Sequence, residues 1–120
     1  MLFRSAVAPF AARAAAALKI ADVANEEGIA TPLAARLAGQ DVALRGYFAP
    51  SVIDGEFLLY EAPAAPCQLC GGLHDAGANL VVSGAAVPPD ASMLRLIEVH
   101  GRIDVVEGRA RLGAARAALV

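Results

Sequence analysis

The sequence predicts a mainly β fold, a five-stranded barrel preceded by one or two short N-terminal helices. Three observations predict it. Alanine is concentrated at the two ends of the chain: residues 1–40 hold 14 of the 29 alanines, whereas residues 41–109 hold 10. Apolar and polar residues alternate through the middle, which is typical of strands, and two of the expected strands contain a glycine, which marks a bulge or a tight bend. We therefore divide the chain into an alanine-rich helical lead-in, residues 1–40, and a barrel domain, residues 41–120.

The lead-in contains strong helix formers from Ser5 to about Ala24, and the polar run at residues 25–28 ends this pattern. A second, short helix is expected to begin after Thr31, because threonine is a favourable N-cap and Pro32 suits the first helical position. Gly39 is expected to stop it. We expect these helices to form a plain cap on the barrel.

The sequence of the lead-in allows two other interpretations. The spacing of Ala24 and Gly28 suits a helix-turn-helix, but the second helix offers only Thr31 and Arg36 for contacts with DNA. An export signal would use residues 5–12 as its apolar segment and residues 15–17 as a cleavage site, and Arg13 interrupts that arrangement. The sequence is therefore compatible with export to the periplasm and with a cytoplasmic location.

The barrel domain is expected to hold five strands. The first begins at Asp41 and runs through Gly46 to Phe48, and Asp54-Gly55 predicts a tight turn before the second, residues 57–60. The third is expected at residues 79–84 and the long fourth at residues 95–106. The fifth follows a turn at residues 107–108 and is a strand to about residue 117, or a strand that runs into a short helix.

Five strands with Gly46 and Gly101 inside two of them suit a small barrel of the oligonucleotide/oligosaccharide-binding (OB) type. A helix usually precedes the fourth strand of such barrels. Here the link at residues 85–94 contains Pro88-Pro89 and is too short and broken for that helix. We expect irregular structure in its place.

Composition and motifs exclude several functions. A net charge of −2 and a pI of 5.6 argue against the broad basic surface of a nucleic-acid-binding protein, and no apolar run reaches the length of a transmembrane segment. The sequence contains no Ser/His/Asp grouping, paired carboxylates or phosphate-binding loop. We therefore expect a non-enzymatic binding protein.

The chemistry-bearing residues lie between the second and third strands. Cys67 and Cys70 form a C-x-x-C pair, which can chelate one transition-metal ion through two thiolates. His74 adds an imidazole, and Asp75 or the distant His100 could supply the fourth ligand. No Lys or Arg occurs between Arg45 and Arg95, so this stretch prefers cations to phosphates. The sequence predicts a zinc site made of Cys67, Cys70, His74 and Asp75.

Two alternative functions stay open beside the metal site. The cysteines could form a disulfide or act in thiol-disulfide exchange, although no arginine near them lowers their pKa. The barrel could instead bind single-stranded nucleic acid or an oligosaccharide by stacking. Its only nearby stacking candidates are aromatic residues of the first two strands, some of which we expect to be core: Tyr47, Phe48, Phe57 and Tyr60.

Several segments of residues 36–120 carry a resemblance to a known family. They are Gly39 to Pro50, Phe57 to Leu59, Pro66 to Cys70, Asn79 to Val82 and Val99 to Ile103. Together they resemble small bacterial proteins of unknown function that have an OB-type barrel. These proteins are often exported or encoded beside ABC-type transporters, some in zinc-responsive settings. The resemblance implies an OB barrel and a tie to metal handling, with a transporter component as a partner.

Overall fold

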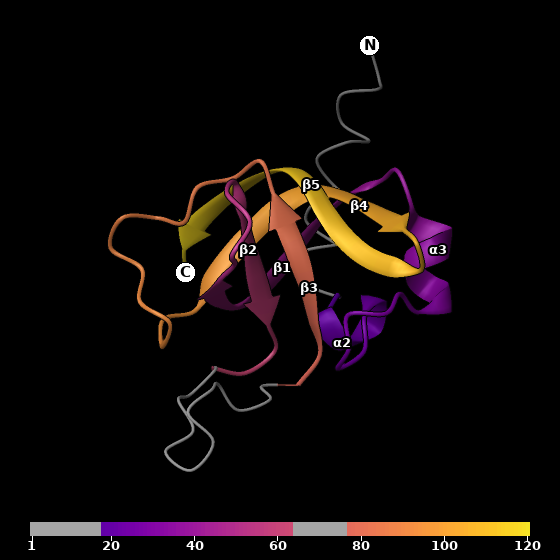
Figure 1. Ribbon diagram of the computed structural model, residues 1–120, viewed down its shortest axis with the longest axis horizontal. Helices are drawn as coiled ribbons and strands as arrows, with labels where there is room; N and C mark the ends of the chain where they lie inside the picture. Colours follow the sequence, from indigo (N-terminus) through magenta and orange to yellow (C-terminus); the bar gives the residue numbers. More distant parts are fainter. Residues whose placement is uncertain (1–17, 64–76) are drawn as a thin grey trace, which may run out of the picture.

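The computed structural model describes residues 18–63 and 77–120, except for the side chains of residues 114 and 115. Two short helices precede five strands: α2 (Ile20–Val23), α3 (Pro32–Leu37), β1 (Asp41–Pro50), β2 (Glu56–Tyr60), β3 (Asn79–Ser83), β4 (Ile97–Val106) and β5 (Arg109–Leu119). The strands close a barrel in the order β1-β2-β3-β5-β4 (Figure 1). Only the β3–β5 contact is parallel. The predicted OB-like barrel with two preceding helices is confirmed.

Strand β1 is shared by two neighbours because it is long. Its first part, Asp41 to Gly46, pairs with β4, and its last part, Tyr47 to Pro50, pairs with β2. Gly46 lies where the partner changes, and both registers run through without a bulge. A Cβ at Gly46 would lie 2.6 Å from Ile20 Cδ1 and 2.6 Å from the Tyr60 carbonyl oxygen. Gly46 therefore marks a close approach of α2 and β2 to β1.

Gly101 behaves differently from Gly46. The β4–β5 register shifts between His100 and Arg102, so the irregularity predicted in this strand is present. Strand β4 otherwise alternates as expected, with Ile97, Val99 and Ile103 fully buried. Strand β5 continues as a strand to Leu119, which decides between the two alternatives for the end of the chain.

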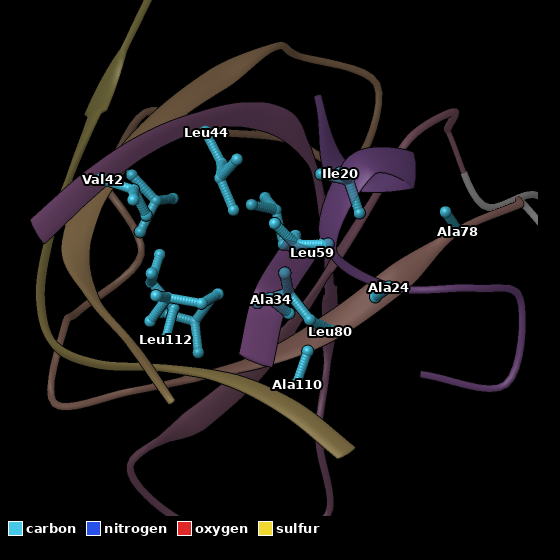
Figure 2. Packing of buried hydrophobic residues seen from close by; sticks show 14 of the residues in the cluster. Ile20, Ala24, Ala34, Val42, Leu44, Leu59, Ala78, Leu80, Ala110 and Leu112 are labelled. Carbon is cyan, nitrogen blue, oxygen red and sulfur yellow. The ribbon is translucent and has the colours of Figure 1, made fainter. Parts of the chain in front are cut away.

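The core is one cluster of alternating strand residues and helix residues. Leu44, Leu59, Leu80, Ile97, Ile103 and Leu112 are its largest fully buried side chains from the strands. Ile20, Val23 and Ala34 of the helices are buried in the same cluster. Figure 2 shows Ile20 and Ala34 among the strand side chains Leu44, Leu59 and Leu80. The two helices thus cap the barrel as expected and contribute to its core.

The helix caps follow the sequence. Thr31 is the N-cap of α3, its Oγ1 accepts a hydrogen bond from the Ala34 amide at 3.3 Å, and Pro32 is the first helical residue. Gly39 adopts a φ of +86° just beyond the helix. The first predicted helix, Ser5 to Ala24, lies partly outside the described residues. Within the described part of this range, the structure contains the short helix α2. In the part of the chain that the structure describes, no helix is long and apolar enough to cross a membrane.

Residues 24–30, which we call the latch, extend the contact between β3 and β5. These two strands pair directly at only two positions, Val81 with Arg111 and Val82 with Leu112. The latch pairs with the beginning of β5, because the Ala30 amide donates to the Gly108 carbonyl at 2.8 Å and the Ala110 amide to the Gly28 carbonyl at 3.1 Å. Backbone hydrogen bonds from the lead-in therefore lengthen the seam, the short line of contact between β3 and β5.

The link between β3 and β4, residues 84–96, has turns and no helix, as expected. It runs around one side of the barrel (Figure 1). Met93 of this link packs with Leu58 and Tyr60 over Ala49, which is completely buried although it faces outward on β1. An irregular segment thus covers part of the outer face of β1 and β2.

Candidate functional site

The predicted ligands Cys67, Cys70, His74 and Asp75 all lie outside the described residues. The structure does describe where their loop leaves and rejoins the barrel, at the end of β2 and the start of β3. Within residues 18–63 and 77–120, no three His, Cys, Asp or Glu side chains come together as a possible metal site. The metal site therefore stays a prediction. The structure describes only its frame, the ends of β2 and β3 that flank the loop.

The loop base is a closed end of the β2–β3 ladder. Tyr60 pairs with Asn79, and the Glu61 amide donates to the Ala78 carbonyl at 2.9 Å, which extends the pairing one step beyond both strands. Ala78 is buried, and Gly77 adopts a φ of +86°, which favours glycine. The two backbone positions that flank residues 62–77, Glu61 and Ala78, are thus hydrogen-bonded to each other.

Asn79 is the polar residue that fixes this base. Its side-chain amide donates to the Gly77 carbonyl at 3.2 Å and to the Glu26 carbonyl at 2.8 Å. Its backbone amide donates to the Asn25 carbonyl at 3.2 Å. The loop base is therefore bonded to the latch, and Figure 2 shows Ala78 beside the ribbon that carries Ala24.

Asn25 and Asn79 are not among the site residues that the sequence predicts. Asn25 Oδ1 accepts hydrogen bonds from the Glu27 and Ile29 amides, both at 2.9 Å, so it shapes the turn of the latch. An Asn-Glu-Glu-Gly run is recognisable as a turn. Nothing in the sequence connects it with Asn79, because the two sites are more than 50 residues apart and meet only in the folded barrel.

His100, considered above as a distant fourth ligand, belongs to a different cluster. It lies on β4, which pairs with β1 and β5 and with neither strand that carries the cysteine loop. Its Nε2 is 2.5 Å from Glu98 Oε2, and Arg45 Nε of β1 donates to Glu98 Oε1 at 2.9 Å. The structure therefore places His100 in a cluster with Glu98 and Arg45.

The Glu98 cluster predicts a small dependence of stability on pH. The hydrogen bond from Arg45, followed by that from His100, holds the pKa of Glu98 below its usual range. The cluster therefore stabilises the folded state above about pH 4.3, the pKa of an unfolded Glu, and this contribution is lost as the pH falls below it. We expect Glu98→Gln to lower the free energy of unfolding at pH 7 by under about 1 kcal/mol, since the cluster is partly exposed. Urea titrations at pH 7 and pH 3 check this, and an equal loss at both would contradict it.

The aromatic residues considered for stacking divide into two groups. Phe57 is buried, and its ring meets that of Phe48 edge to face with 6.4 Å between centroids, so both belong to the barrel interior. Tyr47 and Tyr60 pair across β1 and β2 and are half-buried. The expectation that some of the four are core residues is confirmed.

The comparisons with known proteins add no relationship to these observations. No protein-family model matches the sequence, and no curated protein matches it.

Proposed function

We propose that this protein binds a transition-metal ion, with Zn²⁺ as the first choice, through Cys67 and Cys70 of the β2–β3 loop. His74 and Asp75 complete the ligand set. These four residues offer two thiolates, an imidazole and a carboxylate, which is a donor set that tetrahedral zinc accepts. Zinc would supply a cross-link within the loop, and the proposal includes no reaction.

The observation that supports this proposal best is the closed base of the loop. The hydrogen bond between Glu61 and Ala78 holds the two ends of residues 62–77 together before any metal binds. Bringing the ends of a flexible loop together costs conformational entropy, and a frame that already holds them reduces this cost for a chelating ion. A closed base of this kind would lower the entropic cost of bringing the four proposed ligands together around one ion.

The sequence around the loop is poor in basic residues, which favours a cation, and the Arg109 guanidinium near the loop base is bonded to the Glu27 carbonyl. Glu61 and Glu26 are exposed at the loop base, and no Lys or Arg lies between Arg45 and Arg95 in the sequence. Through the resemblance stated above, we further propose that the protein acts beside a metal transporter. A carrier of this kind would hold the ion and present it to a partner without changing it chemically.

The proposal predicts that the reduced protein binds one Zn²⁺ per chain and that Cys67→Ser/Cys70→Ser lowers the affinity by at least about 100-fold, since thiolates are the strongest ligands of the set. Affinity should also fall with decreasing pH because the thiols must lose their protons. Competition against a chromophoric chelator measures both effects.

His100→Ala is the matched control, because it removes an imidazole outside the loop and should leave zinc affinity unchanged. Cobalt substitution adds a spectroscopic check, since thiolate ligands produce intense charge-transfer absorption that the double serine variant should lose. Equally weak binding of zinc by the native protein and the double variant would exclude the proposed function.

A further inference from the structure

The last part of β5 has one edge that no other described strand pairs with. The first edge of β5 pairs with β4 over almost the whole strand. In the described part of the chain, the second edge pairs with β3 at Arg111 and Leu112 and with the latch at the beginning of β5. Beyond Leu112, no backbone hydrogen bond from residues 18–63 or 77–120 reaches this second edge. We call its final part, residues 116–120, the open edge.

The direction of the backbone groups shows what the open edge offers to another strand. The Val120 amide donates at 3.3 Å to the carbonyl of Leu96, which immediately precedes β4. Successive residues of a strand direct their amide and carbonyl groups to opposite sides, so Ala118 also faces β4. Ala117 and Leu119 therefore face the open edge, each with one N–H and one C=O group. Two donors and two acceptors are available there.

The side chains of the open edge allow a second strand to approach. They are alanine, leucine and valine, with Arg116 as the one charged residue. The segment contains no proline or lysine, which edge strands of natural proteins commonly use to prevent pairing. Ala118 is exposed and small, so a facing side chain meets no bulk at the centre of the segment.

Apolar side chains are exposed where β3 ends, on the same side of β5 as the open edge. The β1–β2 turn is attached there, because the Gly84 amide donates to the Gly55 carbonyl at 3.3 Å. Val52 of this turn is fully exposed, and Ile53 and Val120 are each more than half exposed. Exposed apolar residues near an unpaired strand edge favour a protein partner that adds a strand.

We propose that the open edge is a dimer interface, at which a second copy of this chain adds its own residues 116–120 as an antiparallel strand. A two-fold axis at Ala118 makes this edge self-complementary. Ala117 then lies opposite the partner's Leu119, and Leu119 opposite the partner's Ala117, so both pairs join groups that face the edge. Arg116 lies opposite the partner's Val120, and no like charges meet.

A second copy suits this edge because every molecule carries the same segment, and closed two-fold association is the commonest form of protein oligomer. The paired segment is short, which places the dimer among small, transient interfaces, with a dissociation constant on the order of 10–100 µM. The association requires no metal ion. It is therefore independent of the proposed function, and removal of zinc with a chelator should leave it unchanged.

Sedimentation velocity from about 10 µM to about 1 mM protein measures the association. Ala118→Arg places two like charges opposite each other and should weaken it at least about tenfold. Ala35→Arg is the matched control, because it makes the same change at an exposed alanine of α3 and should dimerise like the native protein. An equal mixture of Ala118→Arg and Ala118→Glu should regain the association. Circular dichroism verifies that each variant is folded.

Hydrogen exchange resolved by residue tests the edge itself. Exchange at the amides of Ala117 and Leu119 should slow as the protein concentration rises, whereas the Ala118 amide, which faces β4, should exchange slowly at every concentration. A native protein that stays monomeric at about 1 mM overturns the proposal. Protection of Ala117 and Leu119 in the monomer also overturns it, because the chain itself then covers the edge. A dimer that Ala118→Arg leaves intact does so too, because it uses another surface.

Discussion

Gly46→Ala is expected to destabilise the barrel by about 3 kcal/mol, because its new Cβ would be overpacked. The new Cβ would lie 2.6 Å from the Tyr60 carbonyl oxygen, 2.6 Å from Ile20 Cδ1 and 3.0 Å from Leu59 Cγ. A side chain can rotate away, but the carbonyl belongs to a strand paired with β1 and can move only with that strand. Urea unfolding followed by circular dichroism measures the loss.

Gly113→Ala is the control for this prediction. Gly113 also lies in a strand, but the nearest atom to its Cβ would be Ser83 Oγ at 4.0 Å, an ordinary contact. This variant should change the free energy of unfolding by under about 0.5 kcal/mol. The double variant Gly46→Ala/Ile20→Val should recover only part of the loss, because the contact with the carbonyl oxygen stays. Equal stabilities for the two alanine variants would show that α2 and β2 do not approach Gly46 as described.

The second large effect is expected for Ile20→Ala, a loss of about 3 kcal/mol. Ile20 is 1% exposed and fills the end of the barrel next to Gly46, so truncation leaves a cavity between α2 and the strands. Removing a buried side chain costs both its transfer from water and the contacts around the cavity. Thermal and urea unfolding measure the effect.

Ile29→Ala makes the same chemical change on the latch, where the side chain is 46% exposed. We expect it to cost well under half as much as Ile20→Ala. The pair therefore separates burial in the barrel from the loss of an isoleucine as such. A small effect at Ile20 would mean that α2 is attached to the surface and does not contribute to the core.

Much of the fold could be predicted from the sequence because the relevant patterns are local. Strands β1, β2, β3 and β4 begin within two residues of the predicted positions, since alternation of buried and exposed side chains repeats every two residues. Thr31, Pro32 and Gly39 act within a single helix and its ends, so their roles are evident without the rest of the chain. The irregular link before β4 was likewise indicated by its own prolines.

The candidate site likewise has a part that the sequence predicts, the ligand set, and a part that it does not, the residues around the loop base. The spacing of Cys67, Cys70, His74 and Asp75 suggests a metal and a ligand set within nine consecutive residues, and this site stays a prediction. Its frame could not be predicted, because Asn79 acts on Glu26, which is 53 positions away. His100 is similar, since its partner Glu98 is on the same strand but Arg45, which completes the cluster, is on β1.

The sequence alone determined the elements of this protein, because hydrophobic period, helix caps and turn residues act over a few neighbouring positions. Only the tertiary structure decided why β1 needs a glycine at its midpoint and what fills the seam between β3 and β5. Both answers depend on backbone groups from distant parts of the chain, the Tyr60 carbonyl in the first case and residues 24–30 in the second. Because the backbone carbonyl is the same in every residue, the sequence does not show which carbonyl will contact a given position in the folded protein.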